Sequence, residues 1–220
     1  MAIEKTFVKE GIKEAEVEEY FAQKFDKAGY SHTEIQRTPL GTRIIVFAHK
    51  PGLVVGRSGR RVHEISDEVK QKFGFENPLV DVKEVENPFL DSNIVAQRIA
   101  KALEKGINYK KVANYYLQKV LEAGAVGIQI KVGGKLGGEK SRFQKFQRGF
   151  IAHSGDYAQT LVQRGMARGS MKPGTIGIQV KIMRESPKEV TYIQPAEEKP
   201  VETPAAETKS EEQKVEEPKA

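Results

Sequence analysis

The hydrophobic positions of the first 87 residues alternate between helical spacing and strand-like runs. Val17, Phe21 and Phe25 form an apolar stripe, which predicts a helix from Ile12 to Ala28. A β-branched and aromatic run follows Gly41 and predicts a strand. The complete predicted order is an extended basic leader (1–11), a helix (12–28), an edge strand (30–37), a strand (42–50), a short helix (51–55), a long helix (60–73) and a strand (79–85).

Asn87-Pro88 marks a boundary, and the pattern beyond it predicts a second domain over residues 88–194. Apolar residues at helical spacing predict a helix from Asp91 to Leu103, with Asp91 or Ser92 as its N-cap. A second helix is predicted from Tyr109 to Ala123, where Gly124 ends it.

Two nearly identical segments stand out in this second part, at residues 127–132 (GIQIKV) and 177–182 (GIQVKI). Each alternates apolar and polar positions, so each predicts a half-buried strand with Gln and Lys outward. We interpret them as two strands of one sheet under similar packing demands, and expect a further strand over residues 157–171. Two helices on a roughly four-stranded sheet make an α+β domain.

Composition changes sharply near the C-terminus. Residues 195–220 hold eight Glu and four Lys, so residues 1–194 carry a net charge of +10 although the whole chain carries only +6. The tail has almost no large apolar residue and is predicted to be disordered and acidic. A basic body indicates a polyanionic partner.

The same sequence argues against several other classes of protein. It has no Cys, which excludes disulfides and thiolate metal sites and fits a reducing compartment. No apolar run approaches membrane-spanning length, and the N-terminus alternates charge where a signal peptide has an apolar core. We therefore expect a soluble, cytosolic protein without a membrane partner.

Candidate chemistry is concentrated first in the GxxG turn, residues Gly56, Arg57, Ser58 and Gly59, followed by Arg60 and Arg61. Glycines let the backbone approach a ligand closely, and the free N–H groups that begin the next helix attract an anion. Segments 124–127 and 134–137 have the same spacing but lack its strand–helix–helix context. The pattern predicts a clamp for a nucleic-acid backbone; the plainer alternative is a glycine helix start beside a solvated basic face.

A second basic cluster consists of Lys135, Lys140, Arg142, Lys145 and Arg148, interleaved with Phe143, Phe146 and Phe150. Cations beside aromatic rings suit RNA, although the phenylalanines are also explained as core residues. We interpret the phenylalanines as core and the cations as RNA-binding, with Arg164, Arg168 and Lys172 extending the surface. On the helix predicted from Tyr109, Lys110 and Lys111 open a polar strip that Asn114 and Gln118 continue; taken alone, the strip indicates a solvent face.

Catalytic patterns are weak. The four histidines show no metal spacing, and the run His153-Ser154-Gly155-Asp156 is interpreted as a turn because adjacency in sequence is not triad geometry. The glycine-rich segment 133–138 lacks the GK[ST] ending of a nucleotide-binding loop. We expect no enzyme activity, no cofactor, no metal and no small-molecule substrate.

The order helix–strand–strand–short helix–helix–strand around the GxxG turn resembles a type II KH domain, whose GxxG loop clamps a single strand. With the segments GAVGIQI at 124–130, VGGKLGG at 132–138 and GTIGIQVKI at 174–182, residues 1–190 resemble the KH-containing third protein of the small ribosomal subunit. The 154–156 region, the absence of Cys and the charged tail resemble the archaeal branch.

This resemblance implies a role as a structural constituent of the small subunit head, with ribosomal RNA and neighbouring ribosomal proteins as partners. It also implies that the protein lines the channel through which mRNA enters. The cations of that channel correspond to Lys110 and Lys111, with Asn114 where a third cation stands in the family. A second departure is Gly133-Gly134-Lys135, which replaces a serine–glycine–arginine-like sequence and keeps the positive charge.

Two other functions compete with this one. A free-standing KH regulator of single-stranded mRNA has the same GxxG turn but does not co-sediment stoichiometrically with small subunits. A nucleic-acid-processing enzyme requires a metal or acid/base site, and incubation with labelled RNA or DNA and magnesium would reveal its turnover.

Overall fold

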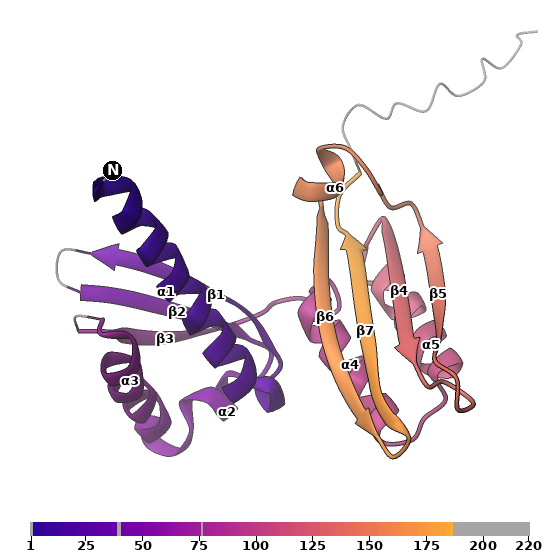
Figure 1. The fold of residues 1–220 in the computed structure, drawn as a ribbon, viewed down its shortest axis with the longest axis horizontal. Coiled ribbons are helices and arrows are strands. Elements are labelled where there is room, and N and C mark those ends of the chain that lie inside the picture. Colours follow the sequence, from indigo (N-terminus) through magenta and orange to yellow (C-terminus); the bar gives the residue numbers. More distant parts are fainter. Residues whose placement is uncertain (1, 39–40, 76, 187–220) are drawn as a thin grey trace, which may run out of the picture. The chain divides into compact units, whose positions relative to one another are not determined.

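The computed structural model describes residues 2–38, 41–75 and 77–186, and the predicted disordered tail lies outside them. Within the described residues the chain forms two β-sheets, each with its own hydrophobic core (Figure 1). None of the described helices has the length and apolar character needed to span a membrane.

The first sheet has the strand order β1-β2-β3, with β1 antiparallel to β2 and β2 parallel to β3. The predicted order of elements and the edge position of β1 are confirmed. The elements are α1 (Ala2–Lys24), a 3-10 turn (Asp26–Ala28), β1 (Tyr30–Thr38), β2 (Gly41–Ala48), α2 (Pro51–Val55), a second 3-10 turn (Arg57–Gly59), α3 (Arg60–Phe73) and β3 (Leu79–Glu84).

The predicted apolar stripes form the first core. Val17, Phe21 and Phe25 are buried, and the rings of Phe21 and Phe25 stack with centroids 5.5 Å apart. Ile65 and Val69 of α3 join the same core. Helix α3 ends where Gly74 adopts a left-handed conformation, which glycine reaches without steric cost.

The prediction of an extended leader was wrong, because α1 begins at Ala2 and continues through Gly11. A side chain at Gly11 would meet nothing within 4 Å, so the glycine sits on an open face of the helix. Arg37 of β1 forms ion pairs with Glu10 and Glu14, the latter with 3.0 Å between Nη2 and Oε1. These contacts join residues 10–14 of α1 to the sheet, a tertiary partner that the sequence pattern alone did not reveal.

The second sheet is antiparallel throughout, in the order β5-β4-β7-β6, and α4 and α5 lie behind it in the view of Figure 1. This arrangement confirms the predicted two helices on a four-stranded sheet. Its elements are α4 (Ser92–Glu104), α5 (Tyr109–Glu122), β4 (Gly127–Gly134), β5 (Arg142–Gly149), α6 (Tyr157–Thr160), β6 (Val162–Met171) and β7 (Gly174–Met183).

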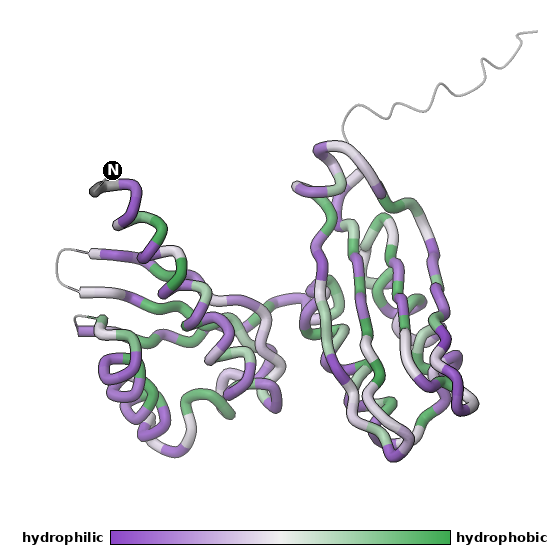
Figure 2. Tube along the Cα trace, viewed as in Figure 1, coloured by the Kyte–Doolittle hydropathy of each residue, from purple (hydrophilic) through white to green (hydrophobic). Residues whose placement is uncertain are grey.

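The two similar segments are neighbours, as predicted: β4 pairs with β7, with Gly133 opposite Gly177. Their isoleucines and valines are buried against the helices, and hydrophobic and hydrophilic stretches alternate along both strands in Figure 2. The predicted strand over 157–171 was wrong at its start. Residues 157–160 form the short helix α6, which begins after a turn at Gly155 and Asp156.

Candidate nucleic-acid interface

The GxxG turn joins α2 to α3 through backbone conformations that favour glycine. Gly56 and Gly59 have φ angles of 72° and 74°, and Ser58 between them has φ 56°. Gly59 is the N-cap of α3, and no side chain caps the N–H groups there. Because those groups carry the positive end of the helix dipole, the turn offers hydrogen-bond donors to an anion.

The three arginines of this turn have different environments. Arg61 folds back over the turn: its Nη1 donates a hydrogen bond of 2.9 Å to the carbonyl of Leu53. A Cβ at Gly56 would lie 2.9 Å from Cγ of Arg61, so Gly56 makes room for this side chain. Arg57 and Arg60 are exposed, and neither forms an ion pair with a carboxylate of the described residues. They are the cations of the turn that are available to a phosphate.

Lys110 and Lys111 lie exposed in the first turn of α5, as expected of a polar strip. Asn108 caps this helix by accepting a hydrogen bond of 2.9 Å from the backbone N–H of Lys110. The strip continues through exposed Asn114 and Gln118. The buried face of the same helix supplies Val112, Ala113, Leu117 and Val120 to the second core.

The structure brings Lys110 together with part of the second basic cluster. A hollow of about 610 Å³ is lined by Lys110 from α5, Lys140 from the glycine-rich turn and Arg142 from β5, with Tyr109 and Phe143 beside them. One carboxylate, Glu139, also lines the hollow. Lys110 and the pair Lys140 and Arg142, about 30 residues further along the chain, therefore share one concave surface beside aromatic rings, an arrangement that suits a phosphate strand.

The rest of the second cluster does not form one surface. Successive side chains of a strand point to opposite faces, so Lys145 and Phe143 lie on one face of β5, and Arg142 and Arg148 on the other. Lys135 is exposed in the turn before β5. The five cations are close in sequence, but the alternation of side chains along β5 places Lys145 on the opposite face from Arg142 and Arg148.

The interpretation of all three phenylalanines as core was wrong for two of them. Phe143 is 71% exposed because it lies on the edge strand β5 and faces away from the helices, and Phe150, the residue after β5, is 41% exposed. Phe146 points to the helix side and packs against the second core, with its ring centroid 6.4 Å from that of Tyr109.

Sequence reasoning left Lys131 and Lys181 out of the candidate site. Both were expected to point outward from their strands, and the structure places them on the same face as Lys145. The alternation of residues 127–132 and 177–182 indicates that both lysines point outward, but only the strand order shows that they share a face with Lys145. Among the described residues, no group of three or more His, Asp or Glu side chains could hold a metal ion. The run from His153 to Asp156 is an exposed turn.

Comparisons with known proteins cover both domains. A KH domain model matches residues 16–90, and the model of the C-terminal domain of ribosomal protein S3 matches residues 99–182. The chain is 46% identical to small ribosomal subunit protein uS3 of Methanocaldococcus jannaschii over 202 residues, which cover 90% of this chain and 97% of that protein.

Further relatives with the same description come from other methanogens. The protein of Methanococcus vannielii is 46% identical over 83% of this chain and 86% of its own length. The protein of Methanococcus maripaludis strain C5 is 43% identical over 87% of this chain and 92% of its own length. These matches confirm the archaeal-type resemblance, and the chain belongs to the uS3 family of small ribosomal subunit proteins.

Proposed function

We propose that this protein is a structural constituent of the head of the small ribosomal subunit, and hence of ribosomes in the cytoplasm, where it binds ribosomal RNA and neighbouring proteins. The observation that carries the proposal is family membership across both domains, at 46% identity over nearly the full length of a relative named as a small-subunit protein. The family is structural and not enzymatic, in line with the weak catalytic patterns of the sequence.

The basic sites are consistent with this role. The GxxG turn offers backbone N–H groups and the exposed side chains of Arg57 and Arg60 to a single RNA strand. Lysine and arginine contacts to phosphate position a protein without reading sequence, which suits a scaffold bound to one fixed RNA.

The finer part of the proposal concerns mRNA. Lys110 and Lys111 stand at the N-terminal end of α5, where the helix dipole disfavours cations, and they line or adjoin the hollow that also holds Lys140 and Arg142. Cations placed together at this end are explained if incoming mRNA phosphates lie opposite them. Asn114 is uncharged, so we expect weaker contact with mRNA phosphates here than three cations would give.

Sedimentation of cell extracts tests the ribosomal role. The protein should co-sediment stoichiometrically with small subunits and remain bound in moderate salt. If it sediments instead with free mRNA and separates from subunits, the free-standing KH regulator is the correct function. Turnover of labelled RNA or DNA by the purified protein with magnesium would contradict both.

A further inference from the structure

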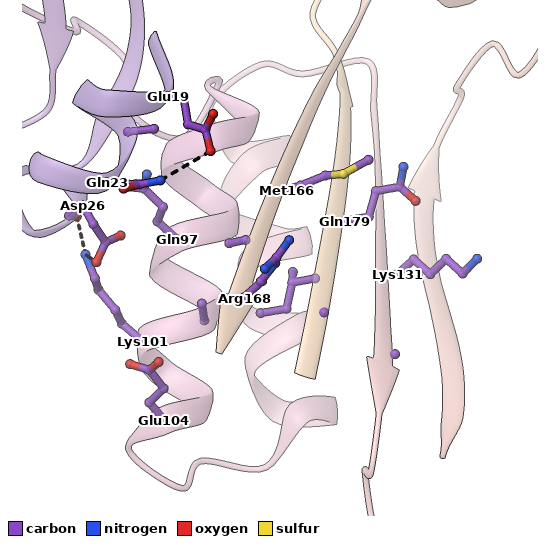
Figure 3. Close-up of a pocket in the computed structure, with 16 residues that line it drawn as sticks. Glu19, Gln23, Asp26, Gln97, Lys101, Glu104, Lys131, Met166, Arg168 and Gln179 are labelled. Atoms are coloured by element: carbon purple, nitrogen blue, oxygen red, sulfur yellow. Dashed lines mark hydrogen bonds and ion pairs between the residues drawn. The ribbon is translucent and has the colours of Figure 1, made fainter. Parts of the chain in front are cut away.

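The sheet face turned away from α4 and α5 carries three cross-strand rows of side chains. We call this surface the open sheet face. Reading across β5, β4, β7 and β6, its rows are Phe143-Gly133-Gly177-Arg168, Lys145-Lys131-Gln179-Met166 and Gln147-Gln129-Lys181-Arg164. Figure 3 shows Met166, Gln179 and Lys131 of the middle row side by side on successive strands.

The charge on this face has a single sign. It holds five cations, Lys131, Lys145, Arg164, Arg168 and Lys181, and the four strands contain no Asp or Glu. The difference extends to the domains: residues 88–186 contain 17 Lys and Arg against 6 Asp and Glu, whereas residues 1–87 contain 14 against 15. The positive charge of the folded body therefore belongs to the second domain, not to the domain with the GxxG turn.

Two like-charged pairs on the open sheet face lie directly opposite each other in register. Lys131 of β4 faces Lys145 of β5, and Lys181 of β7 faces Arg164 of β6. Neighbouring strands are about 4.7–4.9 Å apart, and like charges directly opposite destabilise a sheet. None of the five cations forms an ion pair with a carboxylate in the part of the chain that the structure describes. An external polyanion would convert this repulsion into attraction.

The face also offers surfaces for bases. Phe143 is 71% exposed and Met166 is 70% exposed, and Nζ of Lys131 lies 4.9 Å from the centroid of the Phe143 ring. A ring beside a cation can stack a base while the cation meets the adjacent phosphate. In the third row, Gln129 is only 7% exposed and its Oε1 has no hydrogen-bond partner among the described residues, so it is an unused acceptor on this face.

The open sheet face has defined limits. Beyond its third row, Val162 and Met183 are covered by Ile151 and its neighbours. A hollow of about 830 Å³ extends onto this face, where Met166, Gln179 and Lys131 line it (Figure 3). The carboxylates of Glu19, Asp26 and Glu104, which come from other elements, line the same hollow. Those carboxylates would repel a phosphate strand, so the most favourable area lies towards β5, where Phe143 and Lys145 are outside this hollow.

The geometry points to a second RNA-binding surface: the open sheet face binds a single-stranded RNA segment, with phosphates on its lysines and arginines and a base stacked on Phe143. This inference deepens the proposed ribosomal function, on which it rests, by assigning RNA contact to a surface separate from the GxxG turn. At Phe143 this surface adjoins the hollow that Lys110 lines. Exposed Phe143 favours an unpaired strand over a duplex, because a base must be free to stack.

The test measures binding of the full chain to a fluorescent oligouridylate as a function of salt. The variant Lys131→Gln/Lys145→Gln/Lys181→Gln removes three cations and adds a residue type that this face already carries. The control Lys9→Gln/Lys13→Gln/Lys105→Gln removes the same charge from exposed positions elsewhere. For three lost phosphate contacts, the slope of log affinity against log salt should become shallower by about 2 in the face variant and little in the control.

A second variant tests stacking. Phe143→Ala should weaken binding to the oligouridylate on the order of tenfold and leave binding to an RNA duplex nearly unchanged. If Phe143→Ala weakens binding to single-stranded RNA and to the duplex equally, the inference is overturned in favour of a duplex partner. If Phe143→Ala has no effect and polyglutamate displaces the RNA, the inference is overturned in favour of an acidic protein partner.

A parallel measurement separates this inference from the proposed function. If the triple-glutamine face variant binds RNA like the wild type while Arg57→Ala/Arg60→Ala binds it weakly, the open sheet face is not an RNA-binding surface. The ribosomal role still stands if the wild type co-sediments with small subunits. Loss of co-sedimentation by the wild type would instead overturn the proposed function itself.

Discussion

Gly165 of β6 lies against the backbone of Ser92, the first residue of α4. A Cβ at Gly165 would stand 2.3 Å from both the carbonyl carbon and the oxygen of Ser92. Gly169 lies close to α4 further along β6, where a Cβ built at Gly169 would stand 3.4 Å from the carbonyl oxygen of Ala100. Glycines in β6 therefore set how closely α4 packs on the edge of the sheet.

Replacing Gly165 with Ala should destabilise the protein, because backbone atoms cannot move aside as the end of a flexible side chain can. We expect a loss of about 1–3 kcal/mol or more in the free energy of unfolding, measured by denaturant titration. Gly177→Ala is the matched control in a neighbouring strand, since its Cβ would meet only Gly133 O at 3.9 Å. Similar losses for both variants would show that strand glycine itself, not the contact with Ser92, matters.

Asp91 makes two kinds of contact at the start of α4. Its Oδ1 accepts hydrogen bonds from the N–H groups of Asn93 and Ile94, and its Oδ2 accepts one from the hydroxyl of Ser31. Asp91→Ala should cost about 0.5–2 kcal/mol for the cap alone. Asp91→Asn, which retains a capping oxygen, should lose much less in thermal unfolding; equal losses would assign the effect to charge.

The exposed arginines of the GxxG turn should carry part of the RNA affinity. Arg57→Ala/Arg60→Ala is expected to weaken binding to a single-stranded RNA and to make the salt slope shallower by about 1.4, as for two lost phosphate contacts. Lys9→Ala/Lys13→Ala is the control of equal charge on α1. Unchanged affinity of the arginine variant at matched salt would count against the GxxG turn as a functional clamp.

Lys110→Ala/Lys111→Ala should leave subunit assembly intact, because both side chains point to solvent and the buried face of α5 is untouched. Translation through stable mRNA hairpins should slow more than translation of unstructured message, in a purified translation system. Equal slowing on both messages would contradict the mRNA contact. Failure of assembly would make these lysines contacts to ribosomal RNA or protein.

Alkaline pH should reveal the burial of Tyr30. Burial raises the pKa of its phenol to about 12, against a smaller opposing effect of the hydrogen bond to Thr33. The protonated form is favoured in the folded state, so its contribution to stability is complete below pH 10 and is lost as pH rises towards 12. Tyrosinate absorbance of the wild type minus that of Tyr30→Phe should rise near pH 12; a rise near pH 10 would mean an exposed phenol.

Local patterns in the sequence predicted most elements but not the surfaces that they form. The alternation in residues 127–132 and 177–182 predicted two strands of one sheet, and the spacing of Val17, Phe21 and Phe25 predicted the buried side of α1. The start of α1 was missed because its first turns lack a buried apolar stripe, with Phe7, Val8 and Ile12 exposed, and because Arg37, its ion-pair partner, lies on another element. The local helix propensity of a segment does not reveal ion-pair partners that come from another element.

The candidate site shows the same limit. The sequence grouped Lys135 to Arg148 as one cluster, yet strand alternation divides that cluster, and strand order brings Lys131, Lys145 and Lys181 together. Which strands are neighbours depends on the whole fold, so a surface built across four strands could not be recognised from adjacent residues.

The place of β7 at the centre of its sheet has a consequence during synthesis. The first domain has all its strands once Glu84 has been made, but the second cannot join β4 to β6 until β7, ending at Met183, has been added. At roughly 5–20 residues per second, the chain spends on the order of 5–20 s with its first domain able to fold and its second lacking a central strand. Late in that interval β4 and β6 each lack their β7 neighbour in a segment with a strong excess of positive charge, a state in which shielding by a chaperone or by RNA would matter most.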